Sequence, residues 1–312
     1  MRRTTVTVGP LASASATALC ASQKAPGAFA LALDSTLSSG YSATSLAASQ
    51  AVAGAGDLTL TSAAGVWGGK SVVVVSAGND SGITFTVKGT AAQAGVTYFV
   101  SEVLTGANVS RVATRTLFQT VTSITASGAA AGNVSAGSNG LITMDFARRV
   151  LITSAGNDSG MTFAISGTDW AGNPCSETLT GGNATTAQSV YDYTTVTSIY
   201  PSAATASTVT VGTSGVASSR PIFLDTYGYA PTSIQVTVSG TANYTVQQTL
   251  DNADSASTRY TGVTWVNHPD SSLAAATATA QGNYAYIPRM CRITLNSGSG
   301  SVVMTIIQAG PI

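Results

Sequence analysis

Large apolar side chains alternate with small or polar ones over short stretches of this chain. Met161, Phe163 and Ile165 occupy every second position of residues 161–166, and Val150 and Ile152 do the same just before them. An alternation with a period of two residues places one face of a strand on a core and the other near solvent or a partner. We therefore predict strands at 150–153 and 161–166, and the same pattern predicts strands at 72–75 and 83–87.

The segment between each pair of strands has the composition of a tight turn. Residues 78–82 and residues 156–160 both read Gly-Asn-Asp-Ser-Gly. Asn and Asp side chains accept hydrogen bonds from nearby backbone amides in turns, and Gly tolerates a positive φ. Each pair of strands is therefore predicted to form a β-hairpin.

The middle of the chain contains an internal duplication. Three phrases occur in both copies: residues 76–82 and 154–160, residues 102–106 and 177–181, and residues 120–124 and 195–199. The copies differ in length between Thr90–Ser101 and the shorter Thr168–Ser176, and a difference of this kind is expected in a loop. The repetition predicts two homologous β-modules.

The remaining segments extend the β prediction to the whole chain. Beyond Pro221, turn residues separate short β-branched runs, and Ser239-Gly240 and Asn296–Gly300 are expected to close hairpins. Residues 1–56 are rich in Ala and Ser and are expected to form an extended arm that neighbours must order. The predicted fold class is all-β, with tandem duplicated small β-sandwich modules, a C-terminal β-sandwich and an extended N-terminal arm. The predicted domains are the arm at 1–56, the first repeat at 57–140, the second repeat at 141–216 and the C-terminal sandwich at 217–312.

Charge is scarce in this chain and argues against several classes of partner. Charged residues make up 8% of the chain, and the 13 basic and 13 acidic residues cancel. Nucleic-acid binding normally needs a basic stripe, whereas close basic pairs here are Arg2-Arg3 and Arg148-Arg149, so no nucleic-acid partner is expected. No apolar run approaches the ~20 residues that span a bilayer, so no membrane partner is expected. Weak self-repulsion suits a subunit packed against neighbours, which favours a homo-oligomer or larger assembly.

The cysteines and the N-terminus bear on where the protein is made. Cys20, Cys175 and Cys291 are far apart and lack metal-ligand spacing, so at most one disulfide is expected. Arg2-Arg3 precedes residues 11–19, but that stretch is mostly Ser, Thr and Ala, so no signal peptide is predicted. Synthesis in a reducing cytoplasm fits these observations best.

Candidate catalytic and ligand-binding residues are few. His268, the single histidine, is predicted to be a surface or capping residue of a turn, not the base of a hydrolase triad. Asp251 and Asp254 are the nearest paired carboxylates, but they lie in a polar loop and are predicted to form a solvated turn. Asp80 and Asp158, in the repeated turns, raise the hypothesis of two Ca²⁺ sites, yet one Asp per turn supplies too few ligands. No catalytic, cofactor-binding or metal-binding residue is assigned, no cofactor is expected, and an enzyme is not predicted.

Parts of the sequence resemble a known class of proteins. Residues 150–168, 177–181, 195–199 and 209–215 resemble repeat modules in virion structural proteins of tailed bacteriophages, and residues 233–250, 264–268 and 301–308 look like the sandwich that follows them. This resemblance implies a chain that is synthesised in the cytoplasm of the bacterial host and is then located in the virion. It also implies binding to the major capsid protein or to tail or portal proteins. The chain departs from a long trimeric fibre, because it lacks heptads and long runs of short repeats.

Three hypotheses for function follow. The first is a capsid decoration or cement protein that uses edge strands and the arm to bind the major capsid protein lattice, so that deletion of residues 1–56 would weaken attachment while the modules stay folded. The second is a tail component, meaning an adaptor, a nozzle or a short fibre. The third is an adhesin or carbohydrate-binding module, since Trp170, Trp265 and exposed Tyr could stack on sugars. Tyr191 with Tyr193, and Tyr227 with Tyr229, share one face of a strand and are expected to pack across strands.

Overall fold

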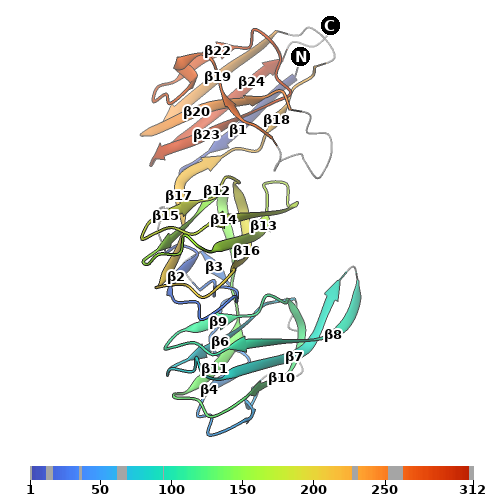
Figure 1. Ribbon diagram of the computed structural model, residues 1–312. Helices are drawn as coiled ribbons and strands as arrows, with labels where there is room; N and C mark the ends of the chain where they lie inside the picture. The colour runs from blue at the N-terminus through green and yellow to red at the C-terminus, as the bar shows by residue number, and fades with distance from the viewer. Residues whose placement is uncertain are drawn as a thin grey trace.

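The computed structural model of this protein describes residues 2–11, 17–34, 37–61, 69–93, 95–226, 231–251 and 263–308. The fold is all-β, as predicted, and consists of three β-modules in a row (Figure 1). Module 1 is built around β6 to β11, module 2 around β12 to β17, and the C-terminal module around β18 to β24. Within the described residues the one helical element is a 3-10 turn at Ser271–Leu273, and none of their helices is long and apolar enough to cross a membrane.

Module 1 consists of two four-stranded antiparallel sheets that share one core. The first sheet has the strand order β4 (Ala47–Gln50), β11 (Val134–Ser138), β6 (Val72–Ser76) and β9 (Arg111–Ala113). The second has the order β5 (Gly56–Asp57), β10 (Phe118–Ala126), β7 (Thr84–Gln93) and β8 (Val96–Thr105). Val72, Phe85, Leu104 and Phe118 are fully buried in the core between the sheets.

Module 2 and the C-terminal module are joined by a twelve-stranded sheet. Its main path is β14 (Pro174–Thr180), β13 (Thr162–Thr168), β16 (Tyr193–Pro201), β12 (Leu141–Ser154), β17 (Val209–Ser218), β23 (Met290–Gly298), β20 (Ala242–Thr249) and β21 (Val266–Asn267). Four further strands pair at its sides: β2 (Cys20–Gln23), β3 (Ser38–Ser39), β15 (Thr186–Gln188) and β18 (Ile222–Phe223). The long strand β17 pairs with β12, and its last residues, Ala217 and Ser218, also pair with β23, so strand pairing continues from one module into the next.

A separate four-stranded sheet completes the C-terminal module. Its order is β1 (Arg2–Val8), β24 (Ser301–Gln308), β19 (Thr232–Ser239) and β22 (Ala280–Asn283). The core that this sheet shares with β20 and β23 contains Tyr244, Leu295 and Met304, all fully buried.

The repeated turns form arches, which join two strands that do not pair with each other, and not the hairpins that the sequence predicts. β6 pairs with β9 and β11, whereas β7 pairs with β8 and β10, and the corresponding strands β12 and β13 of module 2 do not pair with each other either. The turns at 239–240 and 296–300 likewise connect strands of different sheets. The apolar positions of both strands face the same core in an arch, so the alternation resembles that of a hairpin.

The N-terminal segment lies along all three modules, as the blue strands in Figure 1 show. β1 pairs with β24, β2 and β3 pair with β17 and β12, and β4 and β5 pair with β11 and β10. Val8, Leu19, Leu33 and Leu46 of this segment are buried in the three cores. The segment is therefore extended, but the neighbours that order it belong to the same chain. Deletion of residues 1–56 would remove these strands from all three modules.

Candidate functional site

A long hairpin formed by β7 and β8 projects from module 1 (Figure 1). Its strands remain paired from Thr84↔Thr105 out to Gln93↔Val96, whereas the equivalent strands β13 and β14 of module 2 end their pairing at Thr168↔Pro174. The difference in length between the two copies therefore lies in paired strands and not in a loop. The added residues extend the ladder in register, so they cost no backbone hydrogen bonds.

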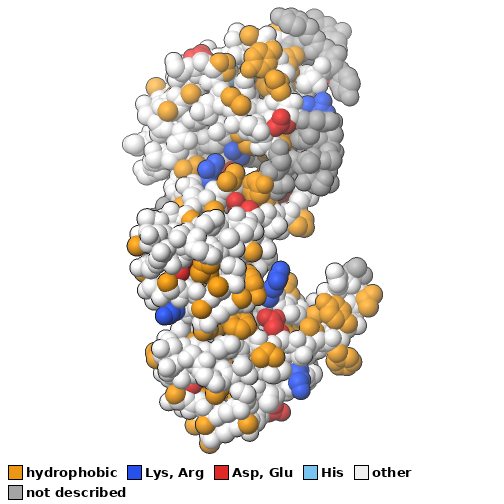
Figure 2. Space-filling view, viewed as in Figure 1, with side chains coloured by type: hydrophobic (Ala, Val, Ile, Leu, Met, Phe, Trp, Pro, Cys, Tyr) orange, Lys and Arg blue, Asp and Glu red, His pale blue; other side chains and the backbone are white. Residues whose placement is uncertain are grey.

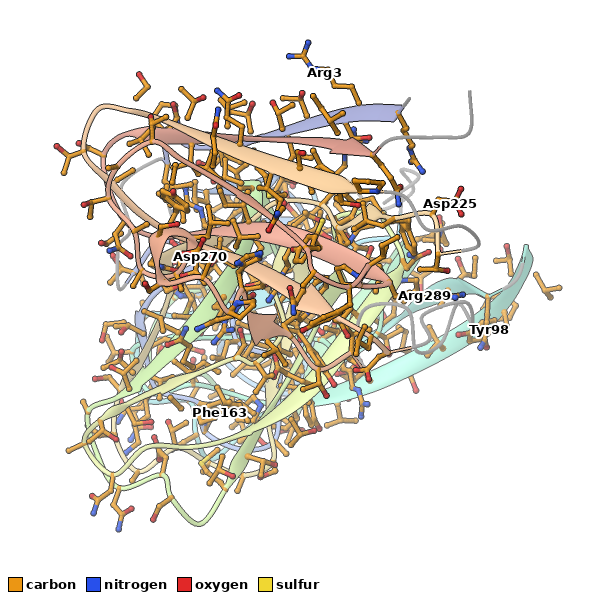
Figure 3. The ribbon with its side chains drawn as sticks, turned by 90° about the horizontal axis from the view of Figure 1, so that it is seen from above. Arg3, Tyr98, Phe163, Asp225, Asp270 and Arg289 are labelled. Carbon is orange, nitrogen blue, oxygen red and sulfur yellow. The ribbon has the colours of Figure 1, made fainter. Side chains whose placement is uncertain are left out.

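The outer strand of this hairpin exposes several large apolar side chains. Val96 is 66% exposed, Phe99 89% and Val103 51%. Apolar atoms cluster on the projecting element in Figure 2, and Figure 3 places Tyr98 on it, away from the body of the molecule. Soluble monomers rarely expose contiguous apolar surface of this kind, and such surfaces mark interaction sites.

The backbone of β8 is also available for pairing. β8 is the last strand of its sheet among the described residues, and residues 96–105 contain no Pro or Lys and a single charge, Glu102. Edge strands of monomeric proteins are usually protected by such residues, or by being short. The equivalent strand β14 is shorter and begins with Pro174. Module 1 thus presents an unprotected edge where module 2 has a protected one.

A cleft of about 380 Å³ lies between module 2 and the C-terminal module. Figure 2 shows basic and acidic side chains gathered at this level of the molecule. The cleft brings together both described tryptophans of the carbohydrate hypothesis, Trp170 and Trp265, with Tyr191. Their sequence positions are far apart, and the junction of β17 with β23 brings them to one place.

Each tryptophan is positioned by a short local structure. Trp170 lies in the turn between β13 and β14, where Asp169 Oδ1 accepts hydrogen bonds from the backbone N–H groups of Ala171 at 2.8 Å and Asn173 at 2.9 Å. Trp265 precedes β21, and the guanidinium of Arg292 lies 4.4 Å from its ring centroid. Arg292 also donates to Gln247 Oε1 at 2.9 Å, so β23 and β20 hold this cation against the ring.

A network of three charged groups forms one side of the cleft. Asp192 Oδ2 accepts hydrogen bonds from Arg292 Nη1 and from the Ser218 hydroxyl, both at 2.9 Å. The other oxygen, Asp192 Oδ1, lies 3.6 Å from Arg149 Nε, and neither atom has a hydrogen-bond partner among the described residues. The Asp192 side chain is only 8% exposed. Burial lowers the pKa of Arg292, and the Asp192 carboxylate opposes this shift.

His268 and Asp251, the residues considered as candidates for catalysis, form hydrogen bonds with the backbone of nearby loops. His268 is buried, not on the surface, and its Nδ1 accepts a hydrogen bond from the backbone of Asp270 at 3.1 Å, which is a capping role. Burial lowers the pKa of His268. Asp251 Oδ2 accepts a hydrogen bond from the Thr264 N–H at 2.6 Å, while Asp254 lies outside the described residues.

Asp80 and Asp158 hold the two arches closed. Asp80 Oδ1 accepts a hydrogen bond from the Ala131 N–H at 2.7 Å, and Asp158 Oδ1 accepts the equivalent bond from Ala206 at 2.8 Å. Both side chains are buried, and the described residues contain no cluster of three or more His, Cys, Asp or Glu side chains that could hold a metal ion. The Ca²⁺ hypothesis gains no support, and each Asp ties its arch to the loop before β11 or β17.

The three cysteines and the two described tyrosines of the sequence analysis differ in burial. Cys20, Cys175 and Cys291 are free thiols, and all three are buried. Tyr193 is fully buried in the core of module 2, whereas Tyr191 is half-buried and lines the cleft. Tyr227 and Tyr229 lie outside the described residues.

Sequence reasoning identified Trp170, Trp265 and Tyr191 but missed the charged residues beside them. The sequence marked Arg149 only as one member of a basic pair. No local pattern predicts the contact between Arg292 and Asp192, because Asp192 lies a hundred positions earlier in the chain. Comparison of the chain with protein-family models, with curated proteins and with solved structures gave no match.

Proposed function

We propose that this chain is a structural subunit of a tailed-bacteriophage virion that decorates the capsid by binding the major capsid protein lattice. The observation that carries the proposal is the exposed apolar edge strand β8. An edge of this kind pairs with a strand of a neighbouring protein, with main-chain hydrogen bonds supplying affinity and alternate side chains supplying specificity. The resemblance of the repeats to phage virion proteins is the reason why we propose the major capsid protein as this neighbour.

The surface of the hairpin fits a protein partner better than a charged one. Phe99 and Val103 are four positions apart in β8, and side chains an even number of positions apart lie on the same face of a strand. Val103 also lines a recess of about 310 Å³ together with Phe29 and Tyr200. Burial of one large apolar side chain contributes about 1.5–3 kcal/mol, so a few such contacts per copy suffice when many copies act on one shell.

The decisive experiment grafts the short turn of module 2 onto module 1. Replacement of Thr90–Ser101 by the sequence of Thr168–Ser176 removes the apolar tip, and module 2 shows that the surrounding sheet tolerates the shorter connection. We expect the graft to retain the melting temperature but to lose co-sedimentation with shells from a phage lacking this gene. A graft that still binds the shells at wild-type level would contradict the proposal.

Point variants give a finer test of the same surface. Phe99→Lys is expected to weaken shell binding by at least about 30-fold, the effect of losing an interface hot spot. Leu117→Lys is the matched control, since Leu117 is exposed in module 1 but lies outside the hairpin. Equal loss of binding in both variants would indicate a general charge effect.

Localisation distinguishes the capsid from the tail. Cryo-EM of purified particles is expected to show this chain on the shell, in a copy number comparable with that of the major capsid protein. Density confined to the tail would replace decoration with an adaptor, nozzle or short-fibre role. Absence of the chain from the particles would remove the virion proposal altogether.

A further inference from the structure

We propose that the cleft between module 2 and the C-terminal module is a binding site for a neutral saccharide. The cleft is separate from the β7–β8 hairpin, so the proposal stands or falls independently of capsid attachment. Its volume of about 380 Å³ lies within the range of roughly 300–1,000 Å³ that is typical of small-molecule sites.

The aromatic side chains of the cleft supply the apolar part of the recognition. Trp170 and Trp265 come from opposite modules and both line the cleft, with Tyr191 beside them. One face of a pyranose ring carries mainly C–H groups, which pack on the electron-rich face of an indole. Arg292 lies over the Trp265 ring, 4.4 Å from its centroid, and so holds this ring in place beside the cleft.

The unsatisfied polar atoms of the cleft supply the polar part. Asp192 Oδ1 needs a donor and Arg149 Nε needs an acceptor, yet the 3.6 Å between them is too long for a good hydrogen bond. A sugar hydroxyl is both donor and acceptor, so it can donate to the carboxylate and accept from the guanidinium. Buried polar groups without partners are rare in native proteins, and a ligand hydroxyl resolves both at once.

The charge of the cleft selects a neutral ligand. Its charged lining residues in the described part of the chain are Arg149, Arg292, Asp169 and Asp192, and their charges cancel. Arg292 and Asp169 already have hydrogen-bond partners within the protein. No full charge is therefore left to pair with an acidic sugar or with an anion.

Tryptophan fluorescence provides a direct assay, because two of the three tryptophans line the cleft. The probes are the neutral disaccharides maltose, cellobiose, lactose and chitobiose, with sialyllactose as the acidic comparison. Each is titrated into the full-length protein carrying Trp67→Phe to remove the third indole. We expect at least one neutral probe to change the emission saturably below about 10 mM, ten times the Kd of a weak complex.

Two substitutions assign the signal to the cleft. Arg149→Gln removes the Nε donor from a partly exposed side chain, and we expect it to weaken binding at least about tenfold. Arg115→Gln is the matched control, because the Arg115 guanidinium also lies on an aromatic ring, 4.9 Å from the centroid of Tyr200, but outside the cleft. We expect Arg115→Gln to leave the affinity unchanged.

Three results would overturn the saccharide proposal or part of it. The absence of saturable binding by all neutral probes overturns the proposal, and binding by sialyllactose alone overturns the assignment to a neutral ligand. Unchanged affinity in both Arg149→Gln and Trp265→Phe places the ligand elsewhere on the chain and also overturns it. A melting curve for each variant verifies that it is folded.

Discussion

At the scale of single residues, burial disfavours the reactive form of each cysteine. Desolvation raises the pKa of Cys20 and of Cys291 to about 12, and that of Cys175 to about 11. Because the thiolate is the reacting species, its fraction at pH 8 falls about 100-fold or more below that of an ordinary thiol. We expect Ellman's reagent to modify the native protein very slowly and all three thiols rapidly in denaturant.

The three thiols should also differ from one another. Cys175 lines the cleft and is 5% exposed, whereas Cys20 and Cys291 are 0% exposed. Mass spectrometry after brief alkylation is therefore expected to find Cys175 modified first. Fast modification of Cys20 or Cys291 in the native protein would show that the strand containing that thiol opens readily.

The lowered pKa of His268 predicts that stability depends on pH. Its pKa is lowered in the folded protein, mainly by burial, and its ring lies 4.9 Å from that of Tyr284 and close to Asp270. The unfolded chain therefore binds the proton at higher pH than the folded chain does. The contribution of His268 to stability should therefore be constant above about pH 6.5 and fall as the pH drops below it.

Urea unfolding at about pH 7.5 and about pH 5.5 measures this effect. The His268→Gln variant keeps an acceptor for the Asp270 amide but does not titrate, so its unfolding free energy should change less between the two pH values. Asp270 does not interfere, since hydrogen bonds from Ser272 lower its pKa from 3.8 and its effect belongs to more acidic solutions. An identical pH response in variant and wild type would contradict the prediction.

At the scale of elements, β1 is a structural strand and not a free arm. Val8 is fully buried opposite Val302, while its neighbour Thr7 is exposed. We expect Val8→Ala to lower the unfolding free energy of the C-terminal module by about 2 kcal/mol, because it leaves a cavity in a closed core. Thr7→Ala, the matched control, should change it by less than about 0.5 kcal/mol. Equal unfolding free energies for the two variants would show that β1 detaches in solution.

The strands of the repeats were predictable from sequence, but their pairing was not. The alternation at Phe163 and Ile165, or at Phe85 and Val87, fixes which side chains are buried, and the structure buries Phe85, Val87, Phe163 and Ile165 completely. It does not fix which strand lies alongside, because a hairpin and an arch use the same turn residues. The arch is specified by a distant hydrogen bond, from Ala131 to Asp80 or from Ala206 to Asp158.

The N-terminal strands were hidden for a different reason. β2, β3, β4 and β5 are short, and their residues are mostly Ala, Ser, Gly and Gln, which carry no periodic apolar signal. They are strands because open sheet edges in modules 1 and 2 accept their backbone groups. Only part of the candidate site was predictable from sequence. The aromatic residues could be identified as candidates, whereas the partners of Asp192 are brought to it by tertiary structure.

At the scale of the whole molecule, polar contacts couple each module to the next. Arg111 of module 1 forms an ion pair with Asp34 of the N-terminal segment, and Asp34 also accepts a hydrogen bond from Ala21 next to β17. Asp192 and Arg292 connect module 2 with the C-terminal module. Together with the continuous sheet through β17, these contacts favour a row of modules that moves as one body, which suits both a lattice-binding subunit and a cleft formed by two modules.

The pairing of β1 with β24 has a consequence for how the protein is made. β1 can pair only after β24 has been synthesised, since Arg2 faces Gln308 and Val8 faces Val302. Contacts between such distant residues close slowly, and domains generally fold in the order of translation. Modules 1 and 2 can therefore acquire their strands during elongation, while β1 stays without its partner until β24 has emerged from the ribosome. We expect a chain that stops before β24 to leave β1 without its pairing partner and Val6 and Val8 without the strand that helps to cover them.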